Sequence, residues 1–94
     1  MLDKKLKNAF NFFQDGNLSY AEQSLKEIIT IYPNHPIALS NLATIYLAIK
    51  KIDDAIYYFN KSILQNPNQP TLLNNFATYM NEQGNFDKAI ELAE

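Results

Sequence analysis

Apolar residues recur three and four positions apart in six segments of the chain, which is the spacing of one face of an α-helix. The pattern predicts helices over about 3–14 and 19–31, and further helices that begin at about 36, 53, 71 and 87. Turns rich in Gly, Asn, Asp and Pro separate these segments. We therefore expect an all-α protein.

Local signals predict several helix ends. Asp3 and Ser19 are expected N-caps, and Glu22, three residues after Ser19, would complete a capping box. Gly16 can take the left-handed conformation that often ends a helix, whereas Lys50 stands where the next such glycine is expected. We expect the turn at Lys50 to be stiffer or slightly strained.

Residue types also repeat at an interval of 34 positions. Alanines do so twice, at positions 9, 43 and 77 and at positions 21, 55 and 89. The central unit reads Leu39-x-x-Leu42-Ala43-x-x-Tyr46, then Ala55-x-x-x-Phe59, then Pro67. This unit resembles the tetratricopeptide repeat (TPR) family, whose 34-residue repeat carries Trp, Leu, Gly, Tyr, Ala, Phe and Pro at these spacings. Leu39 replaces the usual Trp, and Ala43 replaces the usual Gly.

The resemblance implies an α-α superhelix, that is, a right-handed solenoid of antiparallel helix pairs. It implies one domain over 1–94 with repeats at 2–35, 36–69 and 70–94, the last of them incomplete. The alanines would let helix axes approach closely, and each pair would bury the uncovered side of its neighbour. Ile90 and Ala93 have no following helix to cover them, so we expect either a longer array or contact with another chain.

Composition and charge narrow the class of partner. A formal net charge of −2 gives no reason to expect binding to nucleic acid or to an anionic membrane. The N-terminus is not followed by a long apolar run, so neither a signal peptide nor a membrane span is predicted. The expected location is the cytoplasm.

Residues that carry enzyme chemistry are sparse. The chain has one histidine, His35, and no cysteine, so it lacks the ligands of a metal cluster and any Cys–His pair. Its two glycines cannot form a phosphate-binding loop. Asp53 and Asp54 are explained by the favourable interaction of acids with a helix N-terminus. We expect no catalytic residue, no metal and no cofactor.

The resemblance implies a concave groove lined by the first helix of each repeat. Its aromatic end and its amide and hydroxyl end would suit an extended peptide or a helix of a partner protein. The candidate binding residues are Phe10, Phe13, Ser40, Asn41, Thr44, Asn74, Asn75 and Thr78.

Asn41 and Asn75 lie one repeat apart and are expected on the same ridge of this groove. An asparagine amide has both donors and an acceptor, so it can pair with a peptide unit of a bound chain. The pair resembles the asparagine ladder of peptide-binding TPR arrays. The alternative is that asparagine is common in this chain and that this position is often Asn in the family.

The sequence thus favours a non-enzymatic protein-interaction module or scaffold. Two other hypotheses stay open. The chain could be the substrate-recognition arm of a larger enzyme, of the glycosyltransferase or methyltransferase type. It could also be a scaffold that self-assembles through the face at Ile90 and Ala93.

Overall fold

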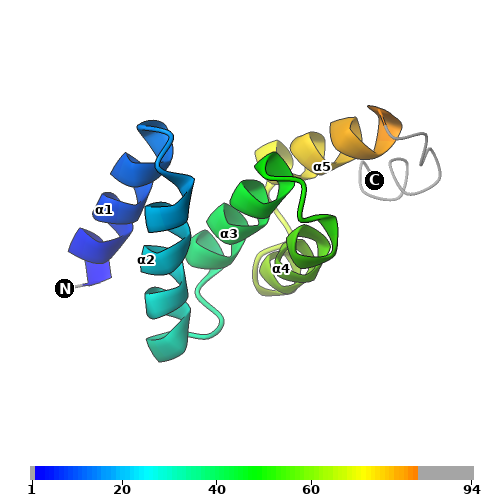
Figure 1. Ribbon diagram of the computed structural model, residues 1–94. Coiled ribbons are helices and arrows are strands. Elements are labelled where there is room, and N and C mark those ends of the chain that lie inside the picture. The colour runs from blue at the N-terminus through cyan, green and yellow to red at the C-terminus, as the bar shows by residue number, and fades with distance from the viewer. Residues whose placement is uncertain (1, 83–94) are drawn as a thin grey trace.

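The computed structural model describes residues 2–82, and within them it contains five α-helices and no strand. The helices are α1 (Leu2–Gln14), α2 (Leu18–Ile31), α3 (Pro36–Ala48), α4 (Ile52–Gln65) and α5 (Pro70–Glu82). Figure 1 shows α1 beside α2 and α3 beside α4. Helix α5 lies on the side of this second pair that faces away from α1 and α2. The expected all-α helical solenoid is confirmed. The helix predicted from position 87 lies outside the described residues, together with Ala89, Ile90 and Ala93.

Two predicted N-caps, Ser19 and Asp3, are wrong, because both residues lie inside the first turn of their helix. Helix α2 begins at Leu18 with Asn17 as its N-cap, and no side chain caps it. Its hydrogen-bond ladder starts at the Asn17 carbonyl, which accepts from the Ala21 amide at 3.0 Å, so Ser19 already lies in the first turn. Asp3 likewise lies inside the first turn of α1, where its charge complements the helix dipole.

The start of α3 is confirmed. Pro36 occupies the first turn, and His35 is the N-cap. The His35 Nδ1 atom accepts a long hydrogen bond from the Ala38 amide at 3.4 Å. The one histidine of the chain therefore has a structural role at a helix end.

The α1–α2 and α3–α4 turns have the same backbone geometry. Gly16 has a φ of 80°, and Lys50 has a φ of 65°, which is unusual for a residue with a side chain. In both turns two successive N–H groups donate back into the preceding helix: Gly16 N to Phe13 O (3.1 Å), Asn17 N to Phe12 O (2.8 Å), Lys50 N to Leu47 O (3.2 Å) and Lys51 N to Tyr46 O (2.9 Å). The expected strain at Lys50 is confirmed.

Buried alanines at the repeat interval form the close contacts between helices. Ala9, Ala43 and Ala77 are buried on the first helices of the repeats, and Ala21 and Ala55 are buried on the second helices. A methyl side chain leaves room for the neighbouring helix, so larger residues fill the space around these positions. The burial of these alanines agrees with the close packing predicted for them.

Aromatic rings connect each helix pair to the next. Phe59 on α4 stacks on Phe76 on α5 with ring centroids 4.4 Å apart, and both side chains are buried. The Lys26 ammonium on α2 lies 5.8 Å from the centroid of the Tyr46 ring on α3. A hydrogen bond to Tyr46 raises the pKa of Lys26, and burial raises the pKa of the Tyr46 hydroxyl.

A buried polar cluster fixes the joint between α4 and α5. The Ser62 hydroxyl is fully buried, donates to the Pro36 carbonyl at 3.2 Å and accepts from the Gln69 amide at 2.9 Å. The same amide group donates to the Asn66 carbonyl at 2.7 Å. Because Pro36 begins α3 and Gln69 precedes α5, this cluster positions the two helices relative to each other.

Candidate functional site

Two adjoining hollows lie between α3 and α5, with volumes of about 230 and 350 Å³. Both contact Thr44 and Asn75, so together they form one open channel along the two helices. We call it the α3–α5 groove. It is lined by Ser40, Asn41, Thr44, Leu47, Ala48, Lys50, Gln69, Pro70, Thr71, Leu72, Asn75, Thr78, Tyr79 and Glu82.

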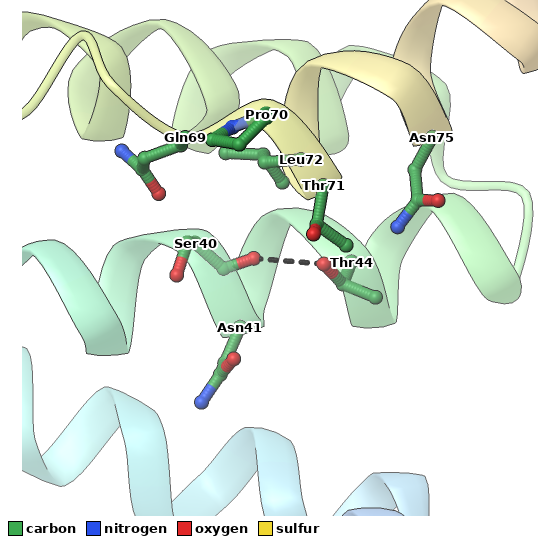
Figure 2. Close-up of a pocket in the computed structure, with 8 residues that line it drawn as sticks. All are labelled: Ser40, Asn41, Thr44, Gln69, Pro70, Thr71, Leu72 and Asn75. Carbon is green, nitrogen blue, oxygen red and sulfur yellow. Dashed lines mark hydrogen bonds between the residues drawn. The ribbon is translucent and has the colours of Figure 1, made fainter.

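The first hollow is lined by hydroxyl and amide groups and by the apolar side chains of Pro70 and Leu72, and no described residue brings a charge to it (Figure 2). The Thr44 hydroxyl donates to the Ser40 carbonyl at 3.0 Å, and the Ser40 hydroxyl donates to the Ile37 carbonyl at 3.0 Å. Each hydroxyl proton is thus used within α3, and the oxygen lone pairs are left to accept hydrogen bonds.

Asn41 and Asn75 occupy equivalent positions on α3 and α5, 34 residues apart. Their side chains leave the two helices in the same general direction in Figure 2. Neither amide makes a hydrogen bond within residues 2–82. Each therefore has both donors and an acceptor available to a bound chain.

Buried contacts and hydrogen bonds hold the wall of the first hollow at the α4–α5 joint. Leu72 is buried. The Gln69 side-chain amide donates to the carbonyl oxygen and to the hydroxyl oxygen of Ser62. A wall that is ordered before binding lowers the entropy cost of association.

The second hollow combines an apolar wall with one cation and one anion. Leu47, Ala48 and the Tyr79 ring supply the apolar surface. The Lys50 ammonium lies 5.2 Å from the centroid of the Tyr79 ring, a cation–π distance. Glu82 lines the same hollow from the end of α5.

The structure brings five of the eight predicted site residues together in this groove: Ser40, Asn41, Thr44, Asn75 and Thr78. Asn74 is exposed but does not line either hollow, because the adjacent Asn75 takes the groove-facing position on α5. Phe10 is 51% exposed on α1, away from both hollows. Phe13 is half-buried and packs against the core. A part in binding for these three residues stays a prediction.

Lys50, Tyr79 and Gln69 were not among the predicted site residues. Tyr79 lies four positions after Asn75, so the helical period itself could have placed both on one face of α5. No local pattern indicates Lys50 or Gln69, because both lie in turns whose path depends on the tertiary packing.

Within residues 2–82, no group of His, Cys, Asp and Glu side chains is arranged to hold a metal ion. None of the five described helices is long and apolar enough to cross a membrane. In this part of the chain every buried side-chain polar atom has a hydrogen-bond partner. The lining of the α3–α5 groove offers a guest hydrogen-bonding groups, an apolar wall and the charges of Lys50 and Glu82.

A tetratricopeptide repeat family model matches residues 12–75. The chain belongs to the tetratricopeptide repeat family. The expected resemblance is therefore confirmed over most of the chain.

The chain is also similar to two curated proteins and to one solved structure. The chain is 34% identical to the uncharacterized protein ycf37 of Pyropia yezoensis, over 66% of this chain and 35% of that protein. It is 29% identical to the photosystem I assembly protein Ycf3 of Rippkaea orientalis, over 87% of this chain and 53% of that protein. A structure of Pseudomonas aeruginosa pilF covers 96% of this chain with a TM-score of 0.83 at 21% identity, which shows a shared fold. This chain corresponds to 40% of that structure. It spans about a third to a half of the length of the two curated relatives.

Proposed function

We propose that this chain is a non-catalytic protein-interaction module whose α3–α5 groove binds an extended segment of a partner protein. The observation that carries the proposal is the position of Asn41 and Asn75. Two amides one repeat apart line the same open channel, and neither is used by the fold within residues 2–82.

The lining favours a peptide backbone as the guest. An extended backbone presents alternating N–H and C=O groups, and an asparagine amide can pair with both. The acceptor oxygens of Ser40 and Thr44 add partners for backbone N–H groups. Such contacts bind a chain without selecting its side chains, as in other modes of extended-peptide recognition.

The shape supports the same conclusion. Small-molecule sites are enclosed cavities of about 300–1,000 Å³ that bury most of the ligand. Here two shallow hollows of about 230 and 350 Å³ follow one another along α3 and α5 and stay open to solvent. An elongated guest fills both hollows, whereas a compact molecule fills only one.

The partner is proposed to be a component of a multi-protein complex. Support comes from the relative named as a photosystem I assembly protein, which is similar over 87% of this chain. A helical repeat that holds an extended segment of one subunit can keep it from other contacts until the complex forms.

Peptide selection followed by mapping tests the proposal. Decapeptides with acetylated and amidated ends are selected from a random library against the chain, and the best binder is titrated into ¹⁵N-labelled protein. The proposal predicts saturable shifts of the side-chain amide signals of Asn41 and Asn75. Absence of any binder, or shifts confined to other surfaces, would contradict it.

A variant with a blocked groove provides the control for location. Thr44 lies in both hollows and is half-buried, so Thr44→Arg places a long side chain in the channel. We expect this variant to lose peptide binding. Thr30→Arg, on the exposed surface of α2, should bind as the unchanged chain does.

A further inference from the structure

Lys50 has a backbone conformation that a glycine would adopt at lower energy. Its φ of 65° lies in the left-handed region, and the equivalent turn of the preceding repeat has Gly16 with a φ of 80°. Backbone strain of this kind is often found where a side chain has a function. The strain at position 50 therefore points to a function of the Lys50 side chain.

The favourable effect of a positive charge at the C-terminal end of α3 does not explain why position 50 is a lysine. A cation near the C-terminus of a helix is favourable because it faces the negative end of the dipole. Lys51, the N-cap of α4, also lies at this end of α3, because its N–H donates to the Tyr46 carbonyl at 2.9 Å, and its φ of −88° lies outside the left-handed region. A glycine at position 50 would therefore keep a charge at the helix end and remove the strain.

The Lys50 side chain instead extends toward the next repeat. Its ammonium lies 5.2 Å from the centroid of the Tyr79 ring on α5 and lines the second hollow. No carboxylate within residues 2–82 forms an ion pair with it. An ammonium group has three donors and no acceptor, so the group that it best binds is an anion.

We infer that Lys50 and Tyr79 form a subsite of the α3–α5 groove for an acidic side chain of the bound segment. The inference rests on the proposed function and adds a sequence requirement to it. An aspartate or glutamate of the guest pairs with the ammonium, while its neighbour packs on Leu47 and the Tyr79 ring. Among residues 2–82, Lys50 is the one cation in the lining of the two hollows.

Glu82 sets the position of this acidic side chain. It is the one anion that the described part of the chain contributes to this lining, and it lies at the end of α5, beyond Tyr79 along the helix. Like charges repel, so the guest carboxylate is favoured on the α3 side of the hollow and disfavoured beside Glu82. The two charges therefore favour one position of the guest carboxylate within the second hollow.

Matched peptides test the subsite. From the decapeptide selected as above, each acidic residue is replaced in turn by its amide, Glu→Gln or Asp→Asn. At one position the acidic peptide should bind about five-fold tighter than its amide, the upper range for a partly exposed ion pair. This ratio should fall as salt concentration rises.

Variants of the two lysines separate the subsite from the fold. Lys50→Gly should abolish the five-fold ratio and at the same time raise the Tm, because it removes the strain. Lys50→Met keeps the strain and the apolar part of the side chain, and should abolish the ratio without raising the Tm. Lys51→Met, at a lysine outside the groove lining, should keep the ratio.

The outcomes are distinct. A peptide that binds with no acidic preference, or one whose preference survives Lys50→Gly, overturns the subsite and leaves the proposed function standing. Failure of every library peptide to bind the unchanged chain overturns the proposed function, and the subsite with it.

Discussion

The Phe59 ring on α4 stacks on the Phe76 ring on α5, with centroids 4.4 Å apart and ring planes inclined at 30°. Phe59 is 3% exposed and Phe76 is fully buried. This contact joins the second repeat to the third. Since α5 forms one wall of the α3–α5 groove, the groove depends on it.

Phe59→Ala should therefore lower both stability and binding. Truncation of a buried phenylalanine costs about 3–5 kcal/mol, and the stability of a domain of this size is about 5–15 kcal/mol. Urea unfolding followed by circular dichroism measures the loss. Phe10→Ala serves as the control, because Phe10 is half exposed and its removal should cost well under 1 kcal/mol. Equal midpoints for the two variants would contradict the packing described for α5.

The Ser62 cluster gives a second prediction. Ser62→Ala removes the only side-chain donor that reaches the Pro36 carbonyl within the described residues, and it leaves Gln69 with fewer partners. Loss of a buried hydrogen bond should lower the free energy of unfolding by about 1–2 kcal/mol. Ser19→Ala, on the exposed face of α2, should leave it nearly unchanged. If the two alanine variants are equally stable, the cluster does not position α5.

Substitutions at the two residues with positive φ, Gly16 and Lys50, should change the free energy of unfolding in opposite directions. A Cβ at Gly16 would meet no atom of the described residues within 4 Å, so the cost of Gly16→Ala is attributed to its φ of 80°. That substitution should lower the free energy of unfolding by about 1 kcal/mol, and Lys50→Gly should raise it by a similar amount. Thermal unfolding measures both.

Lys51→Gly is the matched control for the turn. Lys51 has a φ of −88°, where glycine relieves no strain and only makes the unfolded chain more flexible. This variant should be slightly less stable than the unchanged chain. A gain in stability for Lys51→Gly equal to that for Lys50→Gly would show that the effect comes from charge rather than from the backbone.

The sequence predicted the features that a repeat imposes on every unit. Alanines at the repeat interval, such as Ala21 and Ala55, and the buried Phe59 follow from the need to bury each helix pair against the next. The strain at Lys50 was also predictable, since the turn there requires a positive φ in both repeats.

Features that depend on the exact course of the backbone were not predictable. Ser19 has the sequence signature of an N-cap, yet Asn17 starts the ladder of α2 because the preceding turn ends there. The repeat interval from Asn41 indicated Asn75 for the groove, whereas the absence of Asn74 from the lining depends on the rotation of α5 about its axis. The position of Lys50 over Tyr79 depends on the distance between two repeats. The binding function of all these groove residues stays a prediction.

The affinity of the double variant Asn41→Ala/Asn75→Ala for the selected decapeptide tests the peptide-binding proposal most directly. Isothermal titration should show binding weaker than that of the unchanged chain by about 1–3 kcal/mol, with the free energy of unfolding nearly unchanged. Asn11→Ala/Asn60→Ala, at two exposed helical asparagines outside the groove lining, should bind with unchanged affinity. Equal affinity of the groove variant and the unchanged chain would contradict the proposal.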